Sequence, residues 1–378
     1  MDIYFDNAAT TKPCDEAVAA AAYMMTECFG NPSSTHAPGR LAAEKLCEAR
    51  SDVAAALGGK ANEVYFTSGG TESDNWALFS AAKHMRHKGK HIISSKVEHD
   101  AIRQSLSELS RQGYEVELLS PEADGSISVD AVKAALRSDT ILVSLMMVNN
   151  ETGAVTDIPA VSKLLKAQKS SALLHTDAVQ SFMHVPFSVK TLGADMVSVS
   201  AHKIHGLKGS GALWIRNGLR MPPYIFGGGQ ESGYRSGTEA MPQIAAFGAA
   251  AKAGKANLAR DIAAMEALRS SIIEQLAEKL PDAQIIGGGS GHVLCLSVPG
   301  CRSEVLLNYL DARGICVSKG SACKRGGRSH VLTEMGLPSD VIDGAIRLSF
   351  SRFNTLDEGE YFVEQLVNAR NELFPKRK

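Results

Sequence analysis

Between residues 63 and 215 the chain alternates between short β-rich runs and longer stretches of helical pattern. The β-rich runs predict seven strands, at Val64–Thr67, His91–Ser94, Val116–Leu119, Ile141–Val148, Ala172–His175, Met196–Ser200 and Ala212–Ile215. The stretches between the earlier strands predict helices at Glu72–Arg86, Ala101–Gln112, Val129–Leu136 and Ile158–Gln168. This alternation is typical of an α/β fold with a mainly parallel sheet covered by helices. Ligands of such sheets bind at the carboxyl ends of the strands.

The pattern changes after an Ala-rich stretch with few helix breakers, Met241–Leu280, which predicts a long helix connecting two domains. Beyond it the chain predicts a smaller α+β domain with strands at Val293–Val298, Ile315–Val317 and Ala345–Phe350 and helices at Ser303–Ala312 and Leu356–Phe374. Chain termini often lie close together. We therefore expect a large domain of residues 16–250 and a small domain of residues 1–15 with 251–378.

Composition excludes several classes of protein. Forty Lys and Arg residues balance 41 Asp and Glu residues, which argues against a dedicated nucleic-acid binder. The longest apolar run, Ala17–Met25, is too short to span a bilayer, and the N-terminus does not resemble a signal peptide. No two of the seven cysteines are three residues apart, so CxxC zinc and redox motifs are absent and reduced thiols in the cytoplasm are expected.

Common nucleotide and metal motifs are also missing. The chain has no Walker A loop, no G-x-G-x-x-G after a predicted strand and no HExxH. The pairs His84/His87 and His202/His205 lack a further ligand at metal-site spacing. A zinc, nucleoside-triphosphate or nicotinamide enzyme is therefore disfavoured, and we expect no bound metal.

Three segments at strand-to-helix boundaries instead suit pyridoxal phosphate (PLP). Lys203 follows a predicted strand, beside Ser and His and before a Gly-rich turn, which suits a Schiff-base lysine, although most lysines are solvated. Asp177 ends another strand and could pair with a pyridinium nitrogen or cap a helix. The turn Ser68–Ser73 could cradle a phosphate or only cap a helix. The three together favour PLP.

The chain resembles the NifS/IscS-type cysteine desulfurases of the class V aminotransferase group, which have PLP fold type I. The resemblance runs nearly end to end. It is carried by Tyr4–Thr11, Gly30–His36, Gly69–Thr71, Glu98–His99, Val148–Gly153, the segments around Asp177 and Lys203, Gly227–Glu231, Arg235–Thr238, Gly320–Cys323 and Ala345–Ser349.

The resemblance implies roles that suit each side chain. Lys203 would bind PLP covalently, and Asp177 would keep its ring nitrogen protonated, which makes the ring an electron sink. Gln180 and Asn150 would hydrogen-bond around the phenolic oxygen or the substrate. His99 would lie over the ring and assist proton transfer. The residues expected around the phosphate are Gly70, Thr71, Ser200 and His202.

The same resemblance implies a homodimer in which Thr238 reaches the phosphate in the partner's site. Arg347 is the candidate for binding the substrate carboxylate, since a guanidinium matches a carboxylate bidentately. Arg352 is the competing candidate. Asn31 could also contact that carboxylate.

A plain aminotransferase needs no thiol, so Cys323 favours a desulfurase over a plain aminotransferase. It lies in the segment Lys319–Arg328, where glycines favour mobility and four cations would stabilise a thiolate. An inert small residue in a turn is the alternative. The segment is basic, one residue shorter than is common in the family, and lacks the usual Leu-Glu-Pro-Ser, so the sulfur acceptor stays open.

The expected function is conversion of L-cysteine to L-alanine with a persulfide formed on Cys323. That sulfur would pass to an acceptor protein, for iron–sulfur cluster assembly or thiolation. Two other classes remain open. One is another PLP enzyme of the same fold, an aminotransferase or a selenocysteine lyase. The other is a non-catalytic platform for sulfur assembly.

Overall fold

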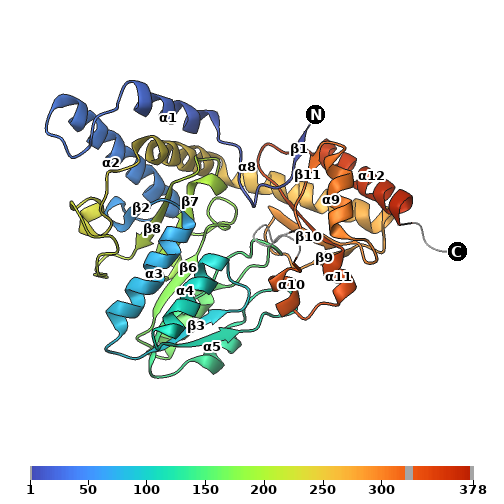
Figure 1. Cartoon of the computed structure of the whole chain (residues 1–378), viewed down its shortest axis with the longest axis horizontal. Coiled ribbons are helices and arrows are strands. Elements are labelled where there is room, and N and C mark those ends of the chain that lie inside the picture. The colour runs from blue at the N-terminus through green and yellow to red at the C-terminus, as the bar shows by residue number, and fades with distance from the viewer. Residues whose placement is uncertain (1, 320–326, 375–378) are drawn as a thin grey trace.

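The computed structural model describes residues 2–319 and 327–374 (Figure 1). The helices are α1 (Asp15–Thr26), α2 (Ala37–Leu57), α3 (Gly70–Met85), α4 (Asp100–Arg111), α5 (Val129–Ala135), α6 (Ile158–Ala167), α7 (Val189–Leu192), α8 (Met241–Lys279), α9 (Ser303–Asp311), α10 (His330–Glu334), α11 (Ser339–Asp343) and α12 (Leu356–Leu373). The strands are β1 (Ile3–Tyr4), β2 (Val64–Thr67), β3 (His91–Ser95), β4 (Glu115–Leu119), β5 (Thr140–Ser144), β6 (Leu173–Asp177), β7 (Met196–Ser200), β8 (Gly211–Ile215), β9 (Gln284–Ile286), β10 (Val293–Ser297), β11 (Ile315–Cys316) and β12 (Ala345–Ser349).

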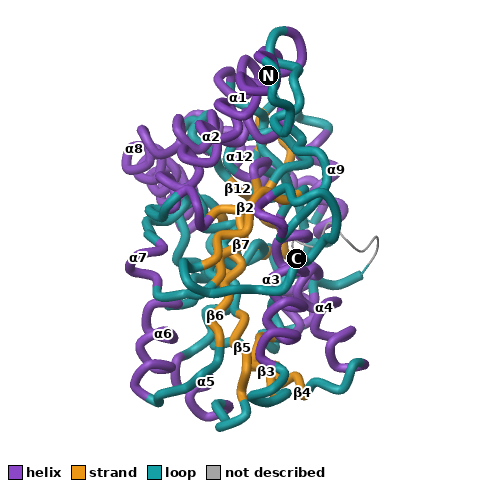
Figure 2. The backbone as a smooth tube through the Cα atoms, turned by 90° about the vertical axis from the view of Figure 1, so that its left-hand side faces the viewer, coloured by secondary structure: helices purple, strands orange, loops and turns teal. Residues whose placement is uncertain are grey.

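The predicted seven-stranded sheet is present, in the order β2-β8-β7-β6-β5-β3-β4. Strand β8 runs antiparallel to both of its neighbours, and the other strands are parallel to one another. Figure 2 shows the strands in the middle of the molecule, with α5, α6 and α7 on one side and α3 and α4 on the other. The carboxyl ends of β2, β3, β5, β6 and β7 therefore lie along one edge.

Burial on both faces explains the continuous apolar strands at the centre of this sheet. Every residue of β5, β6 and β7 is buried. A strand covered by helices on both faces needs no alternation of apolar and polar residues. Polar residues in these strands, such as His175, are instead hydrogen-bonded inside the sheet, to Ser144 and Ser198.

A second hydrophobic core surrounds the small antiparallel sheet β12-β10-β9. The N-terminal segment joins it, because β1 pairs with β11 and the Phe5 ring packs edge-on against Phe350 and Phe362 at 5.3 and 6.2 Å. These contacts agree with the expectation that the first residues pack with the C-terminal part. The boundaries of the two domains stay a prediction.

Helix α8 links the two cores, and Figure 1 shows it running across the molecule. Its first part, including Ile244 and Phe247, packs into the core beside the large sheet. Its later part, including Met265 and Ile272, packs into the second core. One continuous helix therefore ties both halves together. Within residues 2–319 and 327–374, no helix is both long and apolar enough to cross a bilayer.

One predicted strand is too long. The run Ile141–Val148 was expected to be a single strand, but β5 ends at Ser144. The backbone N–H of Met146 donates to the Glu98 carboxylate, at 3.1 and 3.0 Å to its two oxygens, and not to a neighbouring strand. On its other side the chain stays hydrogen-bonded to β6, since the Leu145 and Met147 N–H groups donate to the His175 and Asp177 carbonyls at 3.2 and 3.0 Å. Only the pairing with β3 is lost, and Met146 lines the cavity described next.

Candidate active site

A cavity of about 290 Å³ lies at the carboxyl edge of the large sheet. Segments that follow β2, β3, β5, β6 and β7 form most of its wall, and Ala8, Ala9, His330 and Arg347 complete it. It brings together ten of the predicted site residues: Gly70, Thr71, His99, Asn150, Asp177, Gln180, Ser200, His202, Lys203 and Arg347. The parallel strands of the large sheet place nine of them at one edge, and Arg347 reaches the cavity from β12 of the small sheet.

Lys203 is held in the cavity by the N-terminal segment. It ends a short 3-10 turn, Ala201–Lys203, directly after β7. Its Nζ donates to the backbone carbonyls of Ala8 and Ala9, at 2.6 and 2.9 Å. Two fixed acceptors hold the amine within the site, so Lys203 is not a solvated surface lysine.

Asp74 and Asp177 line the cavity, Glu98 is buried next to His99 in the chain, and burial disfavours the charged form of each of these carboxyl groups. Burial and the charge of Asp177 raise the pKa of Glu98 to about 8 and the pKa of Asp74 well above its ordinary value. Burial also raises the pKa of Asp177, but the Val179 N–H and Lys203 act in the opposite direction and lower it. The surroundings therefore favour a negative charge at Asp177 over one at Asp74 or Glu98.

His99 is a helix cap with a defined proton position. It is the N-cap of α4, and its Nδ1 accepts a hydrogen bond from the Ala101 N–H at 3.1 Å. A neutral imidazole that accepts at Nδ1 carries its hydrogen on Nε2. His99 therefore offers an N–H donor at the ring edge that lies away from the helix.

The part of the cavity that is formed by the turn before α3 and the end of β7 suits a phosphate. Gly69, with φ of 155°, turns the chain from β2 into α3, and a Cβ on Gly70 would lie 2.7 Å from Val179. The buried Ser200 hydroxyl has no hydrogen-bond partner among the described residues. His202 contacts Thr10 at 3.2 Å. A bare helix N-terminus, an unpartnered hydroxyl and a close glycine backbone form a typical anion cradle.

With a lysine, a buried carboxylate and this cradle in one cavity, the residues fit PLP. Lys203 and Asp177 would hold its aldehyde and ring-nitrogen ends, and the turn before α3 would hold its phosphate. No cluster of three or more metal-ligating side chains occurs within the described part of the chain. The sequence analysis assigned no role to Asp74, which lines the cavity, or to Glu98, whose pKa is raised in part by Asp177. The available signal was their place in the chain, one helical turn after Gly70 and directly before His99.

Arg347 lines the cavity, and the competing candidate Arg352 does not. The Arg347 Nη1 donates to the Asn150 carbonyl at 2.8 Å, and its Nη2 to Asp6 Oδ1 at 2.6 Å. Arg352 instead lies 3.6 Å from Asp261 and above the ring of Phe353. The geometry favours Arg347 for a substrate carboxylate.

Two predicted site residues do not line this cavity, and a third falls outside the part of the chain that the structure describes. Asn31 is exposed, and its Oδ1 accepts from the Ser33 N–H within its own loop. Thr238 is also exposed and does not line the cavity. Cys323 lies outside the described residues. The roles predicted for these three therefore stay predictions.

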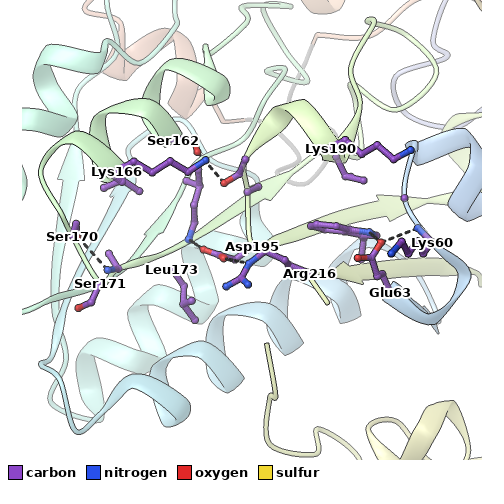
Figure 3. Close-up of a pocket in the computed structure, with 18 residues that line it drawn as sticks. Lys60, Glu63, Ser162, Lys166, Ser170, Ser171, Leu173, Lys190, Asp195 and Arg216 are labelled. Carbon is purple, nitrogen blue, oxygen red and sulfur yellow. Dashed lines mark hydrogen bonds and ion pairs between the residues drawn. The ribbon is translucent and has the colours of Figure 1, made fainter. Parts of the chain in front are cut away.

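A larger cavity, of about 590 Å³, lies elsewhere on the sheet (Figure 3). Its wall includes Lys60, Lys166 and Asp195, and Asp195 accepts from the N–H at the start of β6 and from Arg216. It contains none of the predicted site residues. The chemistry of the lining, and not the volume, identifies the smaller cavity as the candidate site.

Comparisons with known proteins agree with this chemistry. Residues 3–362 match the family described as Aminotransferase class-V. The chain is 41% identical to cysteine desulfurase IscS of Methanosarcina thermophila over 367 residues, which cover 96% of this chain and 90% of that protein. Cysteine desulfurase 2 of Trichormus variabilis is also 41% identical, over 93% of this chain and 89% of that protein.

A solved structure named as a NifS-like protein superposes with a TM-score of 0.91 at 35% identity, covering 97% of this chain and 99% of that one. The chain therefore belongs to the class-V aminotransferase family, within its group of IscS- and NifS-type cysteine desulfurases.

Proposed function

We propose that this enzyme is a PLP-dependent cysteine desulfurase. It converts L-cysteine to L-alanine and collects the sulfur as a persulfide on Cys323. The observation that carries the proposal is the joint placement of Lys203, the buried Asp177 carboxyl group and an anion cradle in one cavity. Membership of a PLP-dependent family supports the same cofactor.

The chain's own groups divide the work of the reaction. When bound, PLP supplies an electron sink for the carbon that loses its proton. Arg347 binds the substrate carboxylate and fixes its orientation. The Lys203 amine is placed to take the α-proton, and His99, with its hydrogen on Nε2, assists.

The sulfur transfer needs no external oxidant. The Cys323 thiolate attacks the substrate sulfur, so an S–S bond forms and the substrate Cβ–S bond breaks. The electron pair of that bond stays on Cβ, which then takes a proton and becomes the methyl group of alanine. The products are one persulfide and one alanine for each cysteine.

The described residues on either side of Cys323 refine the expected charge of its segment. Lys319 pairs with Glu304 at 2.9 Å, and Arg328 pairs with Asp343 at 2.7 Å. Two of the four cations thus already have acidic partners. The other two, Lys324 and Arg325, lie outside the described residues.

Three further parts of the proposal concern partners and location. As the resemblance implies, the enzyme acts as a homodimer in which Thr238, which does not line the cavity of its own chain, reaches that of the partner. The persulfide passes to a sulfur-acceptor protein in iron–sulfur cluster assembly or thiolation. A cytoplasmic location suits the cysteines of the described residues, all of which are free thiols.

Substitution of Cys323 tests the proposed sulfur carrier. Cys323→Ala is expected to keep the yellow colour of bound PLP and to lose both persulfide and sulfide release from L-cysteine. Cys47→Ala is the matched control, because Cys47 is an exposed thiol that does not line the cavity. Mass spectrometry of the protein after reaction with cysteine reads the persulfide directly. Normal desulfuration by Cys323→Ala would overturn the role.

A further inference from the structure

Two buried histidines lie behind the cavity and have no part in the mechanism above. His184 follows Gln180 by one turn, and His292 lies just before β10, in the other half of the molecule. Their rings stack with centroids 4.1 Å apart and an angle of 13° between the planes. His292 is 1% exposed and His184 6%, so the stack is inside the protein.

Hydrogen bonds fix the orientation of the Gln180 amide next to this stack. Its Nε2 donates to the Ala8 carbonyl at 2.9 Å, and only the amide nitrogen can donate to a carbonyl. The Oε1 of Gln180 then faces His292 Nε2 at 3.4 Å. Since Oε1 is an acceptor, His292 must carry its hydrogen on Nε2.

The surroundings keep His292 in this single form. Burial and the positive charges of Arg347 and Lys203, together with His184, hold the pKa of His292 well below its ordinary value. The ring is therefore neutral and has one N–H. Its Nδ1 has no hydrogen-bond partner among the described residues, so nothing there competes for that hydrogen.

We propose that His292 is a positioning residue that makes Gln180 present an N–H, and not its carbonyl, to the cavity. The Gln180 carbonyl is held by His292 and one amide hydrogen by Ala8, which leaves the second amide hydrogen for whatever the cavity binds. The same Ala8 carbonyl accepts from Lys203. His292, which belongs to the second half of the molecule, is thereby linked through Gln180 and Ala8 to Lys203.

The identity of the group that meets this donor rests on the proposed function. If PLP is bound, the donor meets its phenolic oxygen. A hydrogen bond to an anionic oxygen stabilises that anion and weakens its hold on a neighbouring proton. Loss of the donor is therefore expected to raise the pH midpoint of the visible absorbance change of the PLP-loaded protein by about one unit, the size of one such hydrogen bond.

Four variants of the PLP-loaded protein test the proposal by absorbance titration. His292→Phe keeps a ring that can stack on His184 but has no donor, and it is expected to shift the midpoint as much as Gln180→Leu does. His292→Asn keeps an N–H and is expected to shift it less. The double variant Gln180→Leu/His292→Phe is expected to match Gln180→Leu alone. An unshifted midpoint in His292→Phe, or an additive shift in the double variant, would overturn the proposal.

A second measurement needs no cofactor. Nitrogen NMR of the PLP-free protein is expected to show His292 protonated at Nε2 and bare at Nδ1, across the range from pH 6 to pH 8. A hydrogen on Nδ1 would overturn the assignment. If the protein failed to bind PLP, the proposed function would fail on its own, and this spectrum would still decide the orientation of Gln180.

Discussion

The residues around Lys203 show how the site divides its charges. Ala8 and Ala9 supply neutral carbonyl acceptors to the amine. Lys203 in turn lowers the pKa of the buried Asp177, whereas burial raises the pKa of Asp74 and Glu98. These surroundings favour a negative charge at Asp177 over one at either of the other two carboxyl groups.

Replacing Arg347 with lysine tests the proposed carboxylate contact. Lysine keeps the charge but not the planar fork, so we expect KM for L-cysteine to rise roughly 10- to 100-fold, as for loss of a charge-assisted hydrogen bond of about 1.5–3 kcal/mol. The change in kcat should be smaller. Arg352→Lys is the control, because Arg352 pairs with Asp261 away from the cavity. An equal effect of both substitutions on KM would contradict the assignment.

Among the elements, the turn from β2 into α3 places the anion cradle. Gly69 has a φ of 155°, a conformation that side chains rarely adopt, and its absent Cβ would have only Ser200 Oγ nearby, at 4.0 Å. Backbone strain and not crowding therefore requires glycine at this position. The turn exposes the first N–H groups of α3 to the cavity.

Gly69→Ala is expected to destabilise the protein by about 1–3 kcal/mol through this strain and also to weaken PLP binding. Gly218→Ala provides a matched comparison, since Gly218 has a φ of 87° with nothing within 4 Å of an added Cβ and lies outside the cavity. It should lower thermal stability similarly without changing the dissociation constant for PLP. Unchanged PLP affinity in Gly69→Ala would contradict the cradle.

The sequence predicted elements well where burial leaves a clear pattern. All seven strands of the large sheet were expected. Five of them, β3, β5, β6, β7 and β8, are buried throughout, and a strand buried on both faces reads as a short apolar run. The limits of Ile141–Val148 were wrong because pairing with β3 stops there, where the Met146 N–H donates to the distant Glu98 side chain, although hydrogen bonds to β6 continue. Helices α1 and α2 were not predicted, since their many alanines give little contrast between faces.

The sequence predicted only part of the candidate site. Parallel strands bring their carboxyl ends together, so Lys203, Asp177 and the glycine turn could be expected to meet. The resemblance to cysteine desulfurases, now confirmed for the family and the fold, supplied their roles. The contact between His292 and Gln180 joins positions 112 residues apart and has no signature in the sequence.

At the scale of the whole molecule, Thr238 and Lys203 test the proposed dimer. Each Lys203→Ala or Thr238→Ala homodimer should be impaired at both of its sites. A mixed dimer would carry one intact site, with Lys203 from one subunit and Thr238 from the other. After subunit exchange, an equal mixture is therefore expected to recover about a quarter of the wild-type activity per subunit. No recovery, despite mixed dimers seen by mass spectrometry, would place both residues in the site of one chain.

The central claim is that PLP and the Cys323 segment together remove sulfur from L-cysteine. The most direct test is to give L-cysteine and dithiothreitol to the purified, PLP-loaded protein and to quantify sulfide and alanine. The account predicts a yellow protein that releases the two in equal amounts. A keto acid in place of alanine, or a protein that does not take up PLP, would contradict it.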